Sequence, residues 1–303
     1  MALFQLENKR VKPIYEKTFK KEKDVQQLVE NNLTELMNLD FVKTEFAIGK
    51  FRLDTLAYNR ETASFVIIEY KKTKNESLVD QGYTYLNIML EQKAAFVLAF
   101  NEVFPYEIKA IKDIDWSQSR VVFISPVFSS YQKGAASNPQ LPIDLIQVKS
   151  FEKNLIEMEE ITKTNYIADN KKENLESVNK LNKEIKVYTE EDLISKGNEE
   201  SQALYHRIKQ AILDWDPNIQ VTANKHYVSF KRKTNFCDIA IQKKQIKIWL
   251  NAKMGDLDDS QNMFRDVTNI GHYGNGDYEV SIQYDTNVEY ILSVIKQAWM
   301  RGK

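Results

Sequence analysis

Apolar and polar residues follow two different periods in the first half of the chain. Between residues 22 and 38 the apolar positions recur every three or four residues, which predicts a helix that buries one face. Shorter apolar or alternating runs then predict strands. The expected strands are 41–48, 51–58, 64–71, 94–100, 120–126 and 143–152, and further helices are expected at 77–92 and within 102–114. This order is typical of an α/β fold in which helices pack on a mixed sheet.

The pattern changes in the middle of the chain. Residues 165–200 are rich in Lys, Asn and Glu and poor in large apolar residues, which predicts a charged, partly helical linker. Residues 201–303 return to an amphipathic helix, several alternating strands and a closing helix, as in a separate α+β domain. We therefore expect a first domain at 1–164, a linker at 165–200 and a C-terminal domain at 201–303.

The composition narrows the class of protein. The apolar fraction of 43% is that of a folded globular chain, and 42 basic residues balance 43 acidic ones. The whole molecule therefore has no net field that attracts a polyanion, and contact with nucleic acid needs a local patch. The single cysteine, Cys237, excludes an intramolecular disulfide, and the longest apolar run, 94–100, is too short to span a bilayer. We expect a cytoplasmic protein with neither a membrane segment nor a secretory signal.

The stretch FVIIEYKKTK, residues 65–74, places charges at the end of an apolar strand. If this strand forms a hairpin with the preceding one and the turn centres on residues 61–62, Asp54 lies directly opposite Glu69. Side chains alternate along a strand, so Lys71 projects to the same face as Glu69. The hairpin therefore predicts two carboxylates and an ammonium group at one place.

The pairing of Asp54 with Glu69 needs a physical reason, because two close carboxylates repel each other and desolvation adds to the cost. A divalent cation removes both penalties. Magnesium prefers oxygen ligands and often takes one or two carboxylates together with waters and substrate phosphate. A lysine beside it can orient an attacking water and offset charge on the phosphate. Composition and spacing alone leave a second interpretation open, an ordinary exposed ion pair at a strand end.

These residues resemble the motif of the PD-(D/E)XK nuclease superfamily. The likeness covers about residues 20–150 and rests on LDT with Asp54, VIIEYKK with Glu69 and Lys71, and the following DQGYTYL. One departure is Leu53, which stands where the family motif often has proline. The resemblance implies a restriction-endonuclease-like αβββαβ fold with a mixed sheet, in which Asp54, Glu69 and Lys71 are catalytic.

The resemblance also implies accessory residues. Many members carry a helical Q-x-x-x-Y, which Gln81 and Tyr85 match, and Gln81 is accordingly expected to be catalytic. An acidic residue of the first helix often completes the metal shell; Glu30 is the candidate and Glu22 the second choice. The implied ion is Mg²⁺, with Mn²⁺ able to substitute. Its implied ligands are Asp54, Glu69, Glu30 and the backbone carbonyl of Tyr70. Taken singly, Gln81 could instead form a surface hydrogen bond, Tyr85 could be a core residue and Glu30 a solvated helix carboxylate.

The function implied by the resemblance is that of a magnesium-dependent nuclease. Its expected substrate is nucleic acid, DNA in the first place, in antiviral defence against foreign DNA or in repair. Cleavage of two strands would fit a homodimer, and the C-terminal domain could instead hold a protein partner. The alternative is a non-catalytic nucleic-acid-binding or protein-binding module on a nuclease scaffold, which the neutral net charge and the large second domain favour.

The C-terminal domain resembles a domain family of unknown function, over roughly residues 200–303, whose members sometimes carry the label "predicted transport protein". Its most distinctive stretch is GHYGNG, residues 271–276. Glycine permits positive φ and close backbone approach, so a tight loop is predicted. The loop could bind a ligand through His272, but the spacing of a phosphate-binding loop is missing, which favours a structural turn. The histidines and Cys237 do not have metal-ligand spacing.

Overall fold

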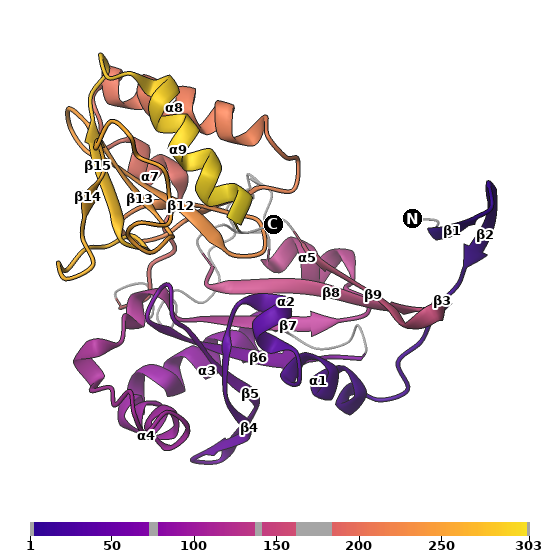
Figure 1. Ribbon diagram of the computed structural model, residues 1–303. Coiled ribbons are helices and arrows are strands. Elements are labelled where there is room, and N and C mark those ends of the chain that lie inside the picture. Colours follow the sequence, from indigo (N-terminus) through magenta and orange to yellow (C-terminus); the bar gives the residue numbers. More distant parts are fainter. Residues whose placement is uncertain (1–2, 73–77, 137–140, 162–183, 302–303) are drawn as a thin grey trace. The chain divides into compact units, whose positions relative to one another are not determined.

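The computed structural model describes residues 3–72, 78–136, 141–161 and 184–301, and the chain forms two compact units, Met1–Val187 and Tyr188–Lys303 (Figure 1). Residues 165–183 of the expected linker lie outside the described residues. The helix α7, Glu190–Ile194, lies in the second unit, where Leu193 is buried in the core. The two units are described separately below.

A seven-stranded mixed sheet forms the centre of the N-terminal unit. Its order is β3-β8-β7-β6-β5-β4, and β9 pairs with β8 outside this path. Strand β5 is antiparallel to its neighbours β4 and β6, whereas β7 runs parallel to both β6 and β8. The strands are β3 (Glu16–Lys17), β4 (Asp40–Ile48), β5 (Phe51–Asn59), β6 (Ser64–Tyr70), β7 (Arg120–Ser125), β8 (Ile143–Phe151) and β9 (Leu155–Glu160). A separate hairpin, β1 (Leu3–Glu7) with β2 (Arg10–Ile14), precedes them.

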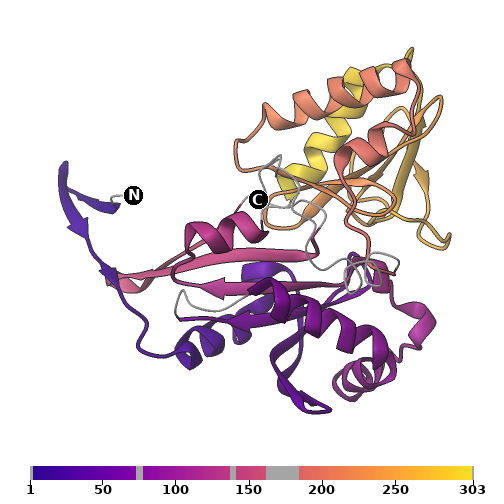
Figure 2. The same ribbon diagram turned by 180° about the vertical axis from the view of Figure 1, so that it is seen from behind.

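Helices cover both faces of this sheet (Figures 1 and 2). On one face lie α1 (Glu22–Glu30) and α2 (Leu33–Met37), which pack on Val66 and Ile68 of β6. On the other face lie α3 (Leu78–Glu91) and α4 (Lys93–Val103), which pack on Phe65 and Ile67. Strand β6 is therefore buried on both faces along its whole length, as its continuous apolar run predicts. A shorter helix, α5 (Ser130–Ala136), follows β7.

The predictions for residues 94–100 and 102–114 were wrong. Residues 94–100 lie within helix α4 and not in a strand. The run contains three alanines, which favour helix, and its buried residues Phe96, Val97 and Phe100 recur at helical spacing. The helix ends at Val103, close before Pro105, and the rest of 102–114 contains only the short 3₁₀ turn η1, Ile111–Asp113. A second 3₁₀ turn, η2 (Trp116–Gln118), precedes β7. The helix expected at 22–38 is interrupted between α1 and α2.

The hairpin of β5 and β6 has the register expected from its turn. Thr55 pairs with Ile68 and Asn59 pairs with Ser64, so the next position along the ladder places Asp54 opposite Glu69. This register puts the two carboxylates on the face of the sheet that carries α3 and α4, because Leu56 and Ile67 point to that face.

The C-terminal unit has its own sheet and its own core. A six-stranded sheet has the order β10-β11-β12-β13-β15-β14, and α8 and α9 pack on its apolar face. All its strand pairs are antiparallel, which makes the unit α+β. Its elements are α8 (Glu199–Leu213), β10 (Gln220–Ala223), β11 (Val228–Lys231), β12 (Asn235–Ile241), β13 (Ile246–Leu250), β14 (Arg265–Asp266), β15 (Tyr278–Ile282) and α9 (Val288–Arg301).

The loop 271–276 is packed tightly against β13. A Cβ atom on Gly274 would lie 2.5 Å from the Trp249 side chain, and one on Gly276 would lie 2.0 Å from the carbonyl oxygen of Leu250. Both ring nitrogens of His272 lie within hydrogen-bond distance of backbone carbonyls, Ile270 O at 2.6 Å and Gly276 O at 3.0 Å. These contacts hold the imidazole within the loop and favour the structural interpretation of His272.

Gly276→Ala is expected to destabilise the protein by at least about 2 kcal/mol, because φ is +84° there and the added methyl group meets backbone. Gly271→Ala is the matched control: a Cβ atom at Gly271 meets nothing within 4 Å, and we expect a change of about 0.5 kcal/mol or less. Chemical denaturation measures both free energies of unfolding. Equal stability of the two variants would contradict the packing described here.

Candidate functional site

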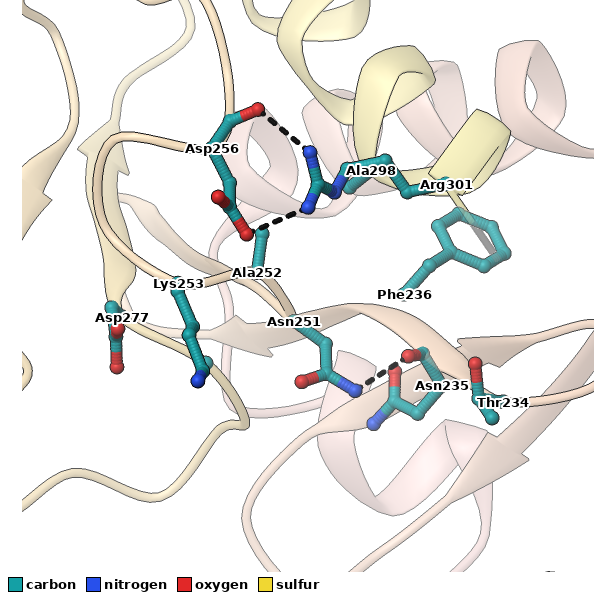
Figure 3. A pocket seen from close by; sticks show the side chains of 11 residues that line it. Thr234, Asn235, Phe236, Asn251, Ala252, Lys253, Asp256, Asp277, Ala298 and Arg301 are labelled. Atoms are coloured by element: carbon teal, nitrogen blue, oxygen red, sulfur yellow. Dashed lines mark hydrogen bonds and ion pairs between the residues drawn. The ribbon is translucent and has the colours of Figure 1, made fainter. Parts of the chain in front are cut away.

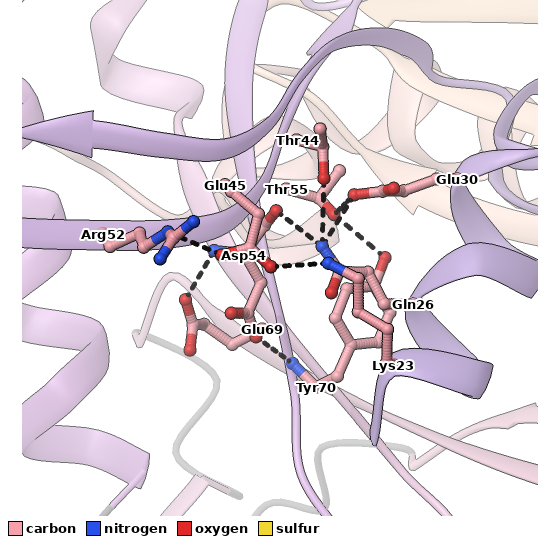
Figure 4. A network of polar contacts seen from close by, with 10 residues as sticks. All are labelled: Lys23, Gln26, Glu30, Thr44, Glu45, Arg52, Asp54, Thr55, Glu69 and Tyr70. Carbon is pink, nitrogen blue, oxygen red and sulfur yellow. Dashed lines mark hydrogen bonds and ion pairs between the residues drawn. The ribbon is translucent and has the colours of Figure 1, made fainter. Parts of the chain in front are cut away.

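The Asp54 and Glu69 carboxylates each accept a hydrogen bond from a backbone N–H of the neighbouring strand (Figure 4). The Asp54 N–H donates to Glu69 Oε1 at 3.1 Å, and the Tyr70 N–H donates to Asp54 Oδ2 at 3.0 Å. Glu69 is 3% exposed, whereas Asp54 is partly exposed. Within the described residues no hydrogen bond to Asp54 Oδ1 is formed, so this oxygen keeps its lone pairs for a ligand.

Lys71 and Gln81 both approach the other oxygen of Glu69. Lys71 Nζ lies 3.6 Å from Glu69 Oε2, and Gln81 Nε2 donates to the same oxygen at 3.0 Å. Gln81 Nε2 also donates to the Tyr85 hydroxyl at 2.7 Å. Helix α3 packs closely on β8 at Gly82, where an added Cβ atom would lie 2.7 Å from Ile143 Cδ1. The structure therefore brings Asp54, Glu69, Lys71, Gln81 and Tyr85 together.

Burial changes the protonation of the carboxyl pair. It raises the pKa of Glu69 from the ordinary 4.5 to about 7, and the neighbouring Asp54 charge adds to this rise. Burial likewise raises the pKa of Asp54, and the charges of Glu45 and Glu22 add to it, while the Tyr70 N–H and the Lys71 charge act in the opposite direction. Without a cation Glu69 therefore remains partly protonated near neutral pH. Groups that resist carrying two negative charges are typical of a site that binds a positive ligand.

This shift predicts the pH dependence of stability in metal-free protein. Between pH 4.5 and 7 the folded state holds a proton on Glu69 that the unfolded state has lost. The proton on Glu69 thus stabilises the folded state below pH 4.5, and this stabilisation is lost as the pH rises through 7. The resulting loss in the free energy of unfolding is on the order of 3 kcal/mol for this group. Urea unfolding in EDTA at pH 5 and pH 8 measures it, and Glu69→Gln is expected to remove most of the difference. An undiminished difference in Glu69→Gln would contradict the assignment to Glu69.

Glu30 lies on the opposite face of β5 from Asp54. Its Oε1 accepts hydrogen bonds from Thr55 Oγ1 at 2.6 Å and from Gln26 Nε2 at 3.0 Å. Thr55 follows Asp54 in the strand, so its side chain points to the face that carries α1. The second choice, Glu22, accepts a hydrogen bond from the Lys72 N–H at 2.7 Å. The structure thus does not bring Glu30 to the carboxyl pair.

Tyr70 is oriented as strand alternation requires. Its side chain is buried on the α1 face, where its hydroxyl lies 3.2 Å from Thr55 Oγ1. Its backbone, in contrast, faces the site, because its N–H donates to Asp54. A role for Tyr70 in the site can therefore come only from its backbone.

Sequence reasoning missed Glu45. Thr44 pairs with Thr55 and Phe46 pairs with Leu53, so Glu45 stands opposite Asp54 in the hairpin of β4 and β5. Glu45 has a φ of 49°. Its carboxylate contacts two cations from different elements, Lys23 Nζ of α1 at 2.9 Å and Arg52 Nε of β5 at 2.7 Å (Figure 4). The register argument used for β5 and β6, applied in the same way to the hairpin of β4 and β5, could have identified Glu45.

The donor set fits magnesium better than a metal with several protein ligands. No group of three or more His, Cys, Asp or Glu side chains with metal-binding geometry occurs in the part of the chain that the structure describes. Two carboxylates, one of them partly exposed with an available oxygen, match the few protein ligands that Mg²⁺ takes when waters and phosphate complete its shell. A closed zinc site would need more ligands.

The chain is similar to proteins of unknown function. Residues 190–302 match a family described as a domain of unknown function, DUF5655. The chain is also 43% identical over 300 residues to an uncharacterised protein of Haemophilus influenzae, across 98% of this chain and 99% of that protein. In the residues that the structure covers, no helix combines the length and apolar character needed to cross a membrane.

Three solved structures show a weaker likeness. An EndoMS–dsDNA complex has a TM-score of 0.25 and 13% identity, over 48% of this chain and 64% of that one. A repair endonuclease from Pyrococcus abyssi has a TM-score of 0.25 and 14% identity, over 48% and 65%. Pyrococcus furiosus SfsA in complex with Ca²⁺ has a TM-score of 0.27 and 15% identity, over 50% and 77%. This chain spans under two thirds of the EndoMS and P. abyssi chains, and TM-scores of this size do not establish a shared fold or activity.

Proposed function

We propose that this chain, which belongs to the same family as the uncharacterised Haemophilus influenzae protein, hydrolyses nucleic-acid phosphodiester bonds in a magnesium-dependent reaction, with DNA as the substrate. The observation that carries the proposal is the meeting of Asp54 and Glu69 across a hairpin, with Lys71 Nζ 3.6 Å from Glu69. The element order α1, β4, β5, β6, α3 and β7 also supports a restriction-endonuclease-like arrangement. Such a fold places these residues at one end of the central strands.

Each residue of the site has a separate task in the proposed reaction. Asp54, Glu69 and the backbone carbonyl of Tyr70 would hold Mg²⁺, which supplies Lewis acidity at the phosphate and lowers the pKa of water. Lys71 orients the water that attacks phosphorus and offsets negative charge as the bond to the leaving oxygen breaks. Gln81 fixes the Glu69 carboxylate through its 3.0 Å hydrogen bond and is a positioning residue.

The direct test is cleavage by purified protein. Plasmid, single-stranded DNA and RNA are incubated with Mg²⁺, with Mn²⁺ and with EDTA. We expect cleavage of DNA with either metal, none in EDTA, and none with Asp54→Asn in either metal. Cleavage by Asp54→Asn at the wild-type rate would overturn the proposal, because it would place the activity elsewhere or in a contaminant.

Lys23 and Arg52 provide positive charge beside the site for the substrate backbone. Both contact Glu45, which stands opposite Asp54, and both remain about half exposed or more (52% and 68%). If both side chains contact phosphates, we expect Lys23→Ala and Arg52→Ala each to reduce the salt dependence of DNA binding. The magnitude of the slope of log K against log salt concentration should fall by about 1 in each variant. Filter binding in EDTA at several salt concentrations measures the slopes. Lys17→Ala, on β3 at the other edge of the sheet, is the control and should leave the slope unchanged; unchanged slopes in all variants would contradict the phosphate contacts.

One observation favours the alternative of a non-catalytic binding module. Both oxygens of Glu69 already accept protein hydrogen bonds, from the Asp54 N–H and from Gln81, so the pair is partly satisfied without metal. Calorimetric titration with Mn²⁺ separates the two functions. Binding that Asp54→Asn abolishes supports the nuclease, whereas nucleic-acid binding without any metal binding supports the module.

A further inference from the structure

A cavity of about 470 Å³ lies in the C-terminal unit, between the start of β12, the segment after β13 and the last turn of α9 (Figure 3). Its carboxylates have protein partners. Arg301 donates to Asp256 Oδ2 at 2.7 Å, and Asp277 Oδ2 accepts a hydrogen bond from a backbone N–H at 3.0 Å. These acidic groups therefore serve the fold. A polar cluster with a closer relation to the proposed reaction lies in the N-terminal unit, on the far side of the sheet from the carboxyl pair (Figure 4).

The β-ladders on both sides of β5 omit Asp54. On the β4 side the neighbouring pairs form, but among the described residues the pair of Asp54 with Glu45 does not. On the β6 side the ladder ends at Thr55, one residue before the position that would pair Asp54 with Glu69. The φ of Glu45, 49°, accounts for the first gap, because a residue in that conformation does not continue a regular strand. Asp54 is thus a strand residue outside both ladders.

Side chains hold the Asp54 backbone instead (Figure 4). Its N–H donates to Glu69 Oε1 at 3.1 Å, and its carbonyl accepts a hydrogen bond from Gln26 Nε2 of α1 at 3.0 Å. The first bond uses a carboxylate that the proposed cation also needs. The second comes from the α1 face of the sheet and uses an amide with no other part in the site. Gln26 is therefore the partner that serves the Asp54 backbone alone.

The orientation of the Gln26 amide is fixed by its surroundings. Gln26 is 4% exposed, and its Nε2 also lies 3.0 Å from Glu30 Oε1 and 3.2 Å from Thr44 Oγ1. The Asp54 carbonyl and the Glu30 carboxylate can only accept, so the amide nitrogen must face them. Glu30 Oε1 is held in turn by Thr55 Oγ1, which donates to it at 2.6 Å. The donor that reaches Asp54 thus has one orientation.

The direction of the Asp54 carboxylate depends on the orientation of its backbone. Its Oδ2 accepts a hydrogen bond from the Tyr70 N–H at 3.0 Å, a contact that requires the side chain to project toward β6. Because no ladder pair restrains Asp54 in the described structure, rotation of its φ and ψ would swing the carboxylate away from Glu69. Partners that orient a metal ligand change metal affinity by about 10- to 100-fold when they are removed.

We propose that Gln26 is a positioning residue of the carboxyl pair: its hydrogen bond to the Asp54 carbonyl, made from the opposite face of the sheet, sets the direction in which the Asp54 carboxylate projects. The functional consequence, tighter binding of a divalent cation, rests on the proposed function. The placement of Asp54 does not, because it involves only groups of this chain.

The first measurement is amide hydrogen exchange by NMR, in EDTA, on the full chain carrying Gln26→Met. Methionine is similar in length to glutamine but has no N–H donor. We expect the Tyr70 amide, which donates to Asp54 Oδ2, to lose at least about tenfold more protection than the Ile67 amide in the middle of β6. A merely structural role lowers the protection of both amides by one factor. Equal changes at the two amides, or none at Tyr70, overturn the proposal.

The second measurement is calorimetric titration with Mn²⁺. Gln26→Met should weaken the affinity by about 10- to 100-fold. Asn101→Leu is the matched control, because Asn101 Nδ2 likewise donates to a backbone carbonyl, that of Lys109 at 2.9 Å, at the end of α4. It should leave the Mn²⁺ affinity within about threefold of wild type and the ratio of the Tyr70 and Ile67 protection unchanged.

The two measurements separate this inference from the proposed function. Unchanged Mn²⁺ affinity in folded Gln26→Met contradicts the inference. Absence of Mn²⁺ binding in the wild-type protein contradicts the proposed function, and the exchange experiment then still decides whether Gln26 places Asp54. If circular dichroism shows that Gln26→Met does not fold, Gln26→Asn replaces it in both experiments with the same expected directions, because its amide is one methylene shorter and loses the bond to Asp54.

Discussion

We expect Glu69→Gln to lower the rate of the proposed metal-dependent DNA cleavage by at least about 10³-fold and, at pH 8 in EDTA, to make the protein more stable. The two effects have one physical cause. Glu69 is 3% exposed, and burial together with the Asp54 charge raises its pKa to about 7, so its ionised form destabilises the metal-free fold. The uncharged amide removes that cost and also removes a ligand that a cation needs. Cleavage under single-turnover conditions and urea unfolding measure the two effects.

The control for this variant is Glu30→Gln. Glu30 contacts Thr55 and Gln26 on the other face of β5, so we expect its rate to stay within about tenfold of wild type. A loss in Glu30→Gln as large as that in Glu69→Gln would contradict the placement of Glu30 outside the metal shell. Glu69→Gln with full activity would exclude Glu69 from the reaction.

We expect Lys71→Ala to lower the proposed cleavage rate by about 10²- to 10⁴-fold while metal binding is retained. Lys71 Nζ lies 3.6 Å from Glu69 Oε2, close enough to act at a phosphate held by the same site. A group that acts on the water and the transition-state charge, and not on the cation, affects kcat more than the affinity for Mn²⁺. Stopped cleavage assays and calorimetric titration with Mn²⁺ separate the two quantities.

Lys72→Ala provides the matched control for Lys71→Ala. Lys72 Nζ donates to the backbone carbonyl of Lys20 at 2.8 Å and does not point to the carboxyl pair. We expect its cleavage rate to stay within about threefold of wild type. If Lys72→Ala and Lys71→Ala lose activity equally, the effect comes from positive charge in general and not from a specific catalytic lysine.

The meeting of Asp54 and Glu69 was predictable because the position of a hairpin turn determines which residues of the two strands lie opposite each other. The short turn before Ser64 defines which residues face each other, and the ladder from Asn59–Ser64 to Thr55–Ile68 follows directly. The alternation of side chains along a strand predicts that Lys71 shares a face with Glu69 and that the Tyr70 side chain points away. The helical spacing of Gln81 and Tyr85 placed both on one face of α3, where Gln81 reaches both Tyr85 and Glu69.

Other features depend on tertiary contacts that no local pattern contains. The run 94–100 is apolar enough for a buried strand or a buried helix, and within helix α4 its Phe96 packs against Phe65 in the core. The face that Glu30 occupies depends on how α1 lies on the sheet, which spacing within the helix does not determine. The positive φ of Glu45 and its contacts with Lys23 and Arg52 likewise involve elements distant in the sequence.

The most direct test of the central claim is a crystal structure of the protein soaked with Mn²⁺, measured at a wavelength where manganese scatters anomalously. We expect an anomalous peak between the Asp54 and Glu69 carboxylates, within about 2.0–2.2 Å of an oxygen of each, and its absence in crystals of Asp54→Asn. Manganese bound elsewhere, with no peak at this pair in well-occupied wild-type crystals, would contradict the account.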